Sequence, residues 1–302
     1  MTKLSLDALE VLEAIDRRGS FAQAAEELFR VPSALTYTVR KLEEDLGVEV
    51  FDRRGHRAKL TAAGRELLEQ GRPLLVAAAA LEARVKRVAQ GWEPELRIAH
   101  DDILPTEGLF PFVERFYRLG SGTRLRIATE VLGGGWDALL SDRADLVVGT
   151  PCEGPAGGGY AVKTLGSHEF VFAVAPHHPL AAAPEPLASC AIQAHRAVAV
   201  ADSSRNLPPR STGLLSGQDI LTVPTLRAKL LAQELGLGVG YLPLGLAADA
   251  LAAGRLLAKA VAAPKPAGPF CMAWKAGPRG RALAWWVEAL SAAEAGAWWQ
   301  PG

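Results

Sequence analysis

The chain of 302 residues is poor in cysteine, and its three cysteines are far apart. Cys152, Cys190 and Cys271 form no Cys-x-x-Cys pair and have no histidine at metal-ligand spacing, so we expect neither a disulfide framework nor a structural metal. Isolated cysteines of this kind more often pack as small hydrophobic side chains. The pattern is typical of a protein from a reducing compartment.

The sequence also lacks an excess of charge and a long apolar run. Its 33 Lys and Arg residues balance its 33 Asp and Glu residues, so any attraction to nucleic acid must come from local clusters of cations. Residues 1–20 carry charges throughout, which argues against a signal peptide, and no uninterrupted apolar run is long enough to span a bilayer. We therefore expect a cytoplasmic protein without a membrane role.

Motifs of catalysis and cofactor binding are missing as well. The triplets Gly133–Gly135 and Gly157–Gly159 lack the lysine and the strand-loop-helix context of a phosphate loop. No serine lies in a Gly-x-Ser-x-Gly motif. We therefore expect no enzymatic activity, no cofactor and no metal ion.

Residues 20–61 contain two short helical patterns, a tight break and a basic segment centred on a glycine. Ser20 and Gln23 have the spacing of a capping box at the start of the first helix. Pro32 suits the first turn of the second helix, which should end at Gly47. Short strands should follow on either side of residues 53–57. This order predicts a winged helix-turn-helix.

The second helix has an apolar face and a polar face. Leu35, Val39 and Leu42 recur at helical spacing and should point inward. Small, hydroxylated and cationic side chains on the opposite face suit base edges in a major groove, while the cations of the wing would lie along phosphates. A polar helix face can equally be solvated in a small helical bundle, and spacing alone does not separate the two interpretations. The residues expected to contact DNA are Pro32, Ser33, Thr36, Tyr37 and Arg40 in the helix, and Arg53, Arg54, Arg57 and Lys59 in the wing.

The same stretch contains a set of short motifs at fixed spacing. They are Gly19-Ser20-Phe21, Ala24-Ala25, Leu28, Ser33-Ala34, Leu42-Glu43, Leu46-Gly47, Phe51, Arg53 and Leu60-Thr61-Ala62-Ala63-Gly64. These motifs closely resemble those of the LysR-type transcriptional regulators. The resemblance implies a sequence-specific DNA-binding protein that a small-molecule effector controls. Pro32 stands where the family usually has glutamine, and Thr36-Tyr37 stand where Ser-Arg is common, so the resemblance carries over no base preference.

A long amphipathic helix should follow, from Ala62 to about Gln90. Pro73 removes a backbone donor, so we expect a kink or break near Arg72. The resemblance implies that this helix pairs with its copy in a second subunit, giving a homodimer that is usually assembled further into a homotetramer. The alternative is that the helix packs only on its own chain. The apolar residues that recur one heptad apart are Leu67, Leu74, Leu81 and Val88.

From Glu95 the pattern changes to strand-length apolar runs that alternate with helical stretches, which predicts parallel sheets with helices on their faces. The fold class expected is α/β with an N-terminal winged helix-turn-helix, a long linker helix and a two-lobed effector domain like the periplasmic solute-binding proteins, as the resemblance implies. The expected strands are 96–99, 125–129, 145–149, 170–175, 197–201, 220–223, 239–242 and 270–274, and the expected helices include 108–119, 135–141, 226–235 and 281–295. The expected domains are residues 1–61 for DNA binding, 62–91 for the linker helix and hinge, and 92–302 for the effector, with lobe I at 95–166 plus 268–302 and lobe II at 167–267.

An effector should bind beyond the carboxyl ends of the strands, where open α/β sheets bind their ligands. Four acidic residues are among these positions, so we expect an effector that is neutral or cationic, or a hydroxylated aromatic that donates hydrogen bonds. The alternative is that the acids face solvent or cap helices. The candidate residues are His100, Asp101, Asp102, Ile103, Glu130, Val131, Thr150, Asp202, Ser203 and Thr225.

Two functions from different classes fit these features. The first is a regulator that binds a double-stranded DNA operator, a small-molecule effector, copies of itself and the transcription machinery. The second is a small-molecule-binding protein of the solute-binding type without a DNA role. The missing export signal and the motif match at residues 19–64 favour the first.

Overall fold

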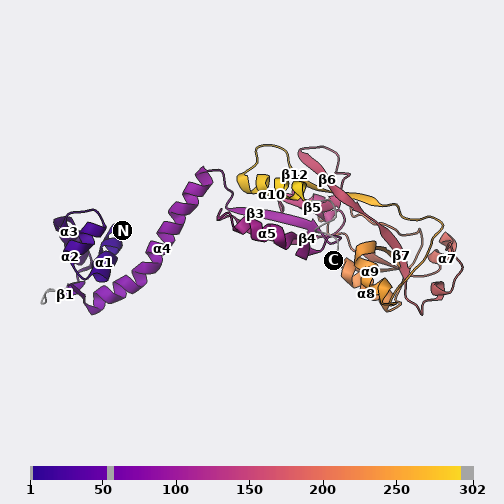
Figure 1. Cartoon of the computed structure of the whole chain (residues 1–302), viewed down its shortest axis with the longest axis horizontal. Helices are drawn as coiled ribbons and strands as arrows, with labels where there is room; N and C mark the ends of the chain where they lie inside the picture. Colours follow the sequence, from indigo (N-terminus) through magenta and orange to yellow (C-terminus); the bar gives the residue numbers. More distant parts are fainter. Residues whose placement is uncertain (1–2, 53–57, 294–302) are drawn as a thin grey trace. The chain divides into compact units, whose positions relative to one another are not determined.

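The computed structural model describes residues 3–52 and 58–293. The chain forms two compact units, residues 1–89 and 90–302, which we describe separately (Figure 1). Within the described ranges, no helix is both long enough and apolar enough to cross a membrane.

The first unit contains a small helical core with a hairpin beside it. Its elements are α1 (Leu6–Arg18), α2 (Phe21–Glu27), α3 (Pro32–Leu46), β1 (Phe51–Asp52), β2 (Lys59–Leu60) and α4 (Ala62–Ala89). Leu12 and Ile15 of α1 pack against Leu35 and Val39 of α3 in one buried cluster. The apolar stripes of these short helices therefore meet in one core, as their periodicity predicts.

The boundaries of α2 and α3 agree with the capping signals in the sequence. Ser20 Oγ accepts a hydrogen bond of 3.2 Å from the backbone N–H of Gln23 at the start of α2. Phe29 has a φ of 54° in the turn that follows. Helix α3 begins at Pro32 and ends at Leu46, where Gly47 caps it with a φ of 72°. Three predicted local signals are thereby confirmed.

The base of the predicted wing is an antiparallel pair in which Phe51 lies opposite Leu60 and Asp52 lies opposite Lys59. The wing residues Arg53, Arg54 and Arg57 lie outside the described residues. The structure therefore describes the start and the end of the hairpin. Of the predicted cations of the wing, Lys59 lies within the described residues.

We expected a kink or a break near Arg72; the break is wrong, because helix α4 runs through Pro73 without interruption, and the helix is visibly curved instead (Figure 1). Packing against α1 holds the turn that precedes the proline. Gly71 is buried against Leu9 so closely that an added Cβ would lie 2.6 Å from a Leu9 methyl carbon. The Arg72 guanidinium also reaches Glu13, at 3.3 Å. These tertiary contacts outweigh the local cost of the missing hydrogen bond.

The first lobe of the second unit is a five-stranded sheet in the order β4-β3-β5-β12-β6. Strands β4 and β5 are parallel to β3, whereas β12 is antiparallel to β5 and β6. Its core is a cluster that includes Ile98, Phe116, Leu146, Met272 and Trp286. The elements are β3 (Glu95–Asp101), η1 (Thr106–Leu109), α5 (Phe110–Tyr117), β4 (Arg124–Glu130), α6 (Gly134–Leu140), β5 (Leu146–Pro151), β6 (Tyr160–His168), β12 (Gly268–Lys275) and α10 (Arg281–Ala292).

The second lobe combines an antiparallel sheet, ordered β10-β7-β11, with the parallel pair β8-β9. The expectation of parallel sheets is therefore wrong for much of this unit. The reason is topological: the chain passes from β6 directly to β7 and re-enters the first sheet at β12 only after completing the second lobe. The elements are β7 (Phe170–Val174), η2 (Pro179–Ala181), α7 (Ser189–Gln193), β8 (Ala197–Val200), β9 (Ile220–Val223), α8 (Leu226–Glu234), β10 (Gly240–Pro243), α9 (Leu244–Ala252) and β11 (Leu257–Ala258).

The structure corrects the expectation about cysteine. Cys152 and Cys271 form a disulfide, with their Cα atoms 5.2 Å apart and a sequence separation of 119 positions. Strand β12 places Cys271 opposite Thr150 of β5, two residues from Cys152. Sheet pairing brings the two cysteines together, and sequence spacing could not show it. Cys190 is a free, exposed thiol.

Candidate functional site

The polar face of α3 is open to solvent, as predicted. The predicted contact residues Pro32, Ser33, Thr36, Tyr37 and Arg40 are all exposed, and Leu35, Val39 and Leu42 on the other face are buried. The Thr36 hydroxyl donates to the Pro32 carbonyl at 3.0 Å, so its oxygen is left as an acceptor. Arg40 pairs with Glu44 at 2.9 Å, but both side chains are exposed and such pairs exchange easily for a stronger partner.

Glu43 is a buried carboxylate that the sequence reasoning missed. Its Oε1 accepts hydrogen bonds from the backbone N–H of Val50, at 2.9 Å, and of Phe51, at 3.4 Å. The bonds tie α3 to the start of β1. The sequence offered one signal for a special role of this residue, because Glu43 follows Leu42 in the Leu-Glu pair of the motif. We assign Glu43 the role of positioning the hairpin relative to α3.

An apolar stripe on α4 is left uncovered in the first unit. Leu74, Leu81 and Val88 are each at least half exposed, and Val85 lies close to the same line. Leu67 differs, because it packs against the core of its own unit. Three of the four predicted heptad positions are therefore free to meet another surface.

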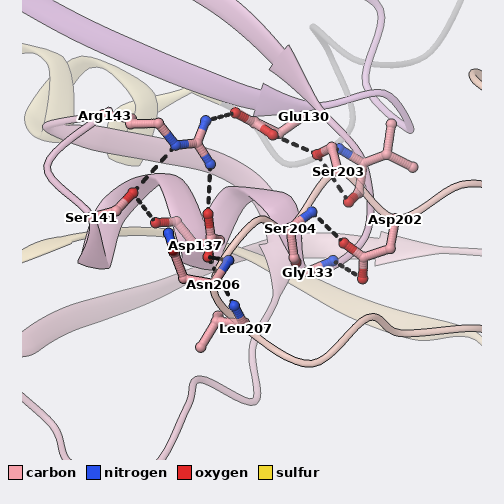
Figure 2. A network of polar contacts seen from close by, with 11 residues as sticks. Glu130, Gly133, Asp137, Ser141, Arg143, Asp202, Ser203, Ser204, Asn206 and Leu207 are labelled. Atoms are coloured by element: carbon pink, nitrogen blue, oxygen red, sulfur yellow. Dashed lines mark hydrogen bonds and ion pairs between the residues drawn. The ribbon is translucent and has the colours of Figure 1, made fainter.

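In the second unit, the predicted acid Glu130 belongs to a network around Arg143 instead of facing an open site, together with Asp137, an acid that was not predicted (Figure 2). The Arg143 guanidinium pairs with Glu130 and lies 2.8 Å from Asp137 Oδ2. Burial by itself would raise the pKa of Asp137, but hydrogen bonds from Arg143 and from the backbone N–H of Asn206 lower it to about 2. The carboxylate of Asp137, which is 1% exposed, is therefore ionised.

The same network joins the two lobes of this unit. The Val131 N–H donates to Ser203 Oγ at 2.8 Å, and Ser203 Oγ donates to Glu130. Asp202 accepts from the Gly133 N–H at 3.1 Å (Figure 2). We call Glu130, Asp137, Arg143, Asp202 and Ser203 the inter-lobe network.

Two glycines allow the close approach in this network. A Cβ on Gly134 would lie 1.8 Å from Ser203 Oγ, and one on Gly133 would lie 2.7 Å from Ser204 Oγ. A larger residue at either position would push the segment after β8 away from the first lobe.

Other predicted effector residues have structural partners within the protein. His100 Nε2 lies 3.0 Å from Thr106 Oγ1 and 3.1 Å from Thr129 Oγ1, and burial lowers its pKa. Asp102 accepts from the Leu226 N–H, and Thr225 caps α8 through the Ala228 N–H at 3.1 Å.

The helix-capping alternative, which concerned the acids, therefore holds for Asp102. Thr225 is itself the N-cap residue of α8. Thr150 is buried, and its hydroxyl makes no hydrogen bond within the described structure.

Three of the ten predicted residues line a cavity of about 80 Å³ between the lobes. Asp101 is one of them; its carboxylate accepts from the Ile103 N–H at 2.9 Å, and burial raises its pKa to about 7. The first lobe contributes Asp101, Ile103, Val131 and Leu132, and the second contributes Phe170, Ala199, Val200, Ser211, Thr212, Leu226, Lys229, Tyr241, Pro243 and Lys265.

The two lysines of this cavity were not predicted. Lys229 is only 7% exposed, and within the described structure neither ammonium group makes a hydrogen bond or an ion pair. Lys265 Nζ lies 3.5 Å from the centre of the Phe170 ring. Burial lowers the pKa of each lysine to about 8. Lys229 lies on the buried face of α8 with Ala232 and Gln233, and this helical spacing could have indicated from the sequence that Lys229 is buried. The sequence contains no comparable signal for Lys265.

A larger groove of about 680 Å³ lies along α8 and α9 and includes Asp102 and Thr225. In its lining Arg255 pairs with Glu234 at 2.8 Å, and Asp102 accepts a hydrogen bond from the Leu226 N–H. We place the candidate effector site in the smaller cavity, because the uncompensated buried charges lie there.

Residues 6–65 match the model of the bacterial regulatory helix-turn-helix protein, lysR family. Residues 89–295 match the model of the LysR substrate binding domain. The two matches together cover most of the chain.

Curated relatives match over nearly the full length. The chain is 44% identical to the uncharacterized HTH-type transcriptional regulator YeeY of Escherichia coli (strain K12), over 95% of this chain and 93% of the relative. It is 42% identical to the probable HTH-type transcriptional regulator YhaJ of the same strain, over 95% and 96%.

Solved structures share the fold. The probable transcriptional regulator PA0477 from Pseudomonas aeruginosa aligns with a TM-score of 0.61 and 22% identity, over 95% of this chain and 97% of that one. Full-length CbnR in complex with its target DNA aligns with a TM-score of 0.53 and 19% identity, over 95% and 99%.

Proposed function

The chain belongs to the LysR family of DNA-binding transcriptional regulators, and from this premise we propose that it reads its operator with the exposed face of α3 and the cations of the wing. The observation that carries the proposal is the separation of α3 into a buried apolar face and an exposed face of Pro32, Ser33, Thr36, Tyr37 and Arg40. In a winged helix-turn-helix such a face is placed for the major groove.

The remaining roles follow from this assignment. We assign Arg53, Arg54, Arg57 and Lys59 to phosphates, and the exposed stripe of α4 to a homodimer that assembles further into a homotetramer. The protein would act in the cytoplasm with the transcription machinery and without catalysis of its own.

The effector would bind in the cavity between the lobes, with Asp101, Ile103 and Val131 in its wall. Three of the four acids behind the expectation of a neutral or cationic effector, Glu130, Asp102 and Asp202, have partners within the protein, and only Asp101 of the four lies in the cavity wall. We propose instead that the inter-lobe network holds the lobes closed, and that a ligand changes operator binding by favouring one degree of closure.

A gel-shift titration tests the proposal and separates it from a solute-binding role. Full-length protein is titrated against DNA from upstream of its own gene and of neighbouring genes, with an unrelated fragment of equal length as control. We expect retention of an upstream fragment over the unrelated one. Equal, weak retention of every fragment would favour a small-molecule-binding protein without a DNA role.

Replacing Lys59 by alanine should weaken operator binding and leave sequence preference unchanged. Removing one phosphate contact should flatten the log-log dependence of affinity on salt by about one unit. Fluorescence anisotropy between 50 and 200 mM salt, the approximate range over which such contacts are resolved, measures the slope. A matched control is Lys163→Ala in the second unit, for which the slope should not change. A changed sequence preference in Lys59→Ala would contradict the assignment to phosphate.

A further inference from the structure

We propose that the inter-lobe cavity takes an effector with a carboxylate group, which the ammonium groups of Lys229 and Lys265 hold. The inference deepens the proposed effector control and rests on it. The proposed effector is an anion, whereas the acids at the strand ends suggested a neutral or cationic effector.

Lys229 supplies the first argument. Its side chain is 7% exposed and lines the cavity, and the described structure contains no carboxylate paired with its ammonium group. A buried charge without a partner is costly, and proteins normally compensate such a charge with an opposite one. An anion in the cavity would supply the missing partner.

Lys265 supplies the second argument, because it brings another positive charge to the same cavity. The two ammonium groups repel each other, which contributes to lowering the pKa of Lys229. A carboxylate has two oxygens and can accept from both groups. Ser211 and Thr212 lie in the same wall and offer hydroxyl groups.

The rest of the ligand can be inferred from the surroundings. Asp101 lies in the wall contributed by the first lobe, so a ligand hydroxyl or amine facing it would find an acceptor. A second cavity of about 230 Å³ shares Tyr241 and Lys265 with the first. Its wall is mainly apolar and includes Phe172, Ile192, Leu214, Leu215 and Val261. The chemistry points to an aromatic or branched aliphatic carboxylate that also carries a hydrogen-bond donor.

Isothermal titration calorimetry with charge-matched probes tests the inference on the full-length protein. The probes are benzoate, salicylate and isovalerate, each beside its neutral amide, with benzylamine as a cationic probe and sulfate as a plain anion. We expect at least one carboxylate to bind about tenfold or more tightly than its amide, because a charge-assisted hydrogen bond is lost in the amide. Sulfate and benzylamine should bind more weakly than that carboxylate.

Lysine variants locate the binding. Lys229→Met keeps the length of the side chain and removes its charge, and should weaken the carboxylate by about tenfold or more. Lys265→Met should act in the same direction. Lys163→Met, which removes an exposed lysine from β6, should leave the affinity unchanged. Thermal unfolding of each variant reports whether it is folded, and removal of an unpaired buried charge should not lower the melting temperature.

The pH dependence gives an independent readout. The titratable side chains of the cavity wall are Asp101, Lys229, Tyr241 and Lys265, and the pKa of each lysine is about 8. Raising the pH from 7 to 9 removes the lysine protons, so carboxylate affinity should fall by about tenfold for each lysine that must be charged. Ionisation of Asp101, whose pKa is about 7, acts in the same direction by repelling the anion.

Two results would overturn the inference. One is that no carboxylate binds more tightly than its amide; the other is that carboxylate binding is unchanged in both Lys229→Met and Lys265→Met. A parallel operator titration separates this failure from failure of effector control. If a neutral or cationic probe alone binds and changes operator affinity, effector control stands and the carboxylate is wrong. If a carboxylate binds through the lysines without changing operator affinity, the carboxylate stands and effector control through this cavity is wrong.

Discussion

Replacing Leu81 by glutamate should dissociate the protein into monomers and lower operator affinity by about 100-fold or more. The side chain is 62% exposed in the single chain, so the substitution leaves the folded unit intact. In a paired helix it would place two carboxylates in an apolar seam, where burying an unpartnered charge costs several kcal/mol. A cost of about 3 kcal/mol corresponds to the 100-fold change.

Light scattering and operator titration together measure this effect. Ala79→Glu is the matched control, because it adds the same charge on the opposite face of α4 two residues away. It should retain both the assembly state and the affinity. If the scattering mass of Leu81→Glu and of Leu74→Glu equals that of the unaltered protein, α4 is not the interface.

The second large effect should come from Arg143→Met. This substitution leaves the carboxylates of Glu130 and Asp137 buried without their cation. Removing one partner of a buried ion pair typically costs about 3–5 kcal/mol, so we expect a loss of about 3 kcal/mol in the free energy of unfolding of residues 90–302. Urea denaturation followed by tryptophan fluorescence measures it, since Trp136 and Trp286 are buried in this unit.

The control and the pH dependence give this prediction its specificity. Arg124→Met removes a surface pair with Glu95, in which the arginine side chain is 77% exposed, and should cost less than about 1 kcal/mol of unfolding free energy.

The pKa of the Asp137 carboxyl is about 2 in the folded protein and near 3.8 in the unfolded chain. Its lowered pKa therefore stabilises the unaltered protein fully above about pH 4, and this contribution is lost as the pH falls towards 2. The difference between the protein and Arg143→Met should shrink over the same range. A constant difference would show that the network is not electrostatic.

The local signals of the first unit could be predicted from the sequence because each lies within a few residues of its effect. The cap at Ser20, the helix start at Pro32 and the helix end at Gly47 depend on neighbouring backbone groups. The continuity of α4 through Pro73 could not be predicted in this way, because contacts with α1, distant in sequence, hold it.

The strands of the second unit were predicted where apolar runs are continuous. Strand β6 was missed, since Lys163, Thr164 and Ser167 interrupt its pattern. The antiparallel direction of β12 and the Cys152–Cys271 disulfide depend on the path of the chain between two lobes. Periodicity within a segment contains no information about that path.

For the effector residues, too, some positions could be predicted from the local sequence and others could not. The rule that ligands bind beyond strand ends found Asp101, Ile103 and Val131. It could not show that Glu130 pairs with Arg143, or that Asp202 accepts a hydrogen bond from a backbone N–H group of another segment. Nor could it find Lys265, which reaches the cavity from the loop before β12.

The central claim is that α3 reads DNA sequence, and sequencing of the genomic fragments retained by full-length protein tests it most directly. The experiment compares the unaltered protein with Tyr37→Ala and Lys59→Ala at a salt concentration where all three bind DNA. We predict that the unaltered protein and Lys59→Ala enrich the same operator sequence, and that Tyr37→Ala loses or changes it, because Tyr37 lies on the exposed face of α3 while Lys59 lies in the wing. Enrichment of one common sequence by Tyr37→Ala and the unaltered protein, with a different sequence for Lys59→Ala, would contradict the account.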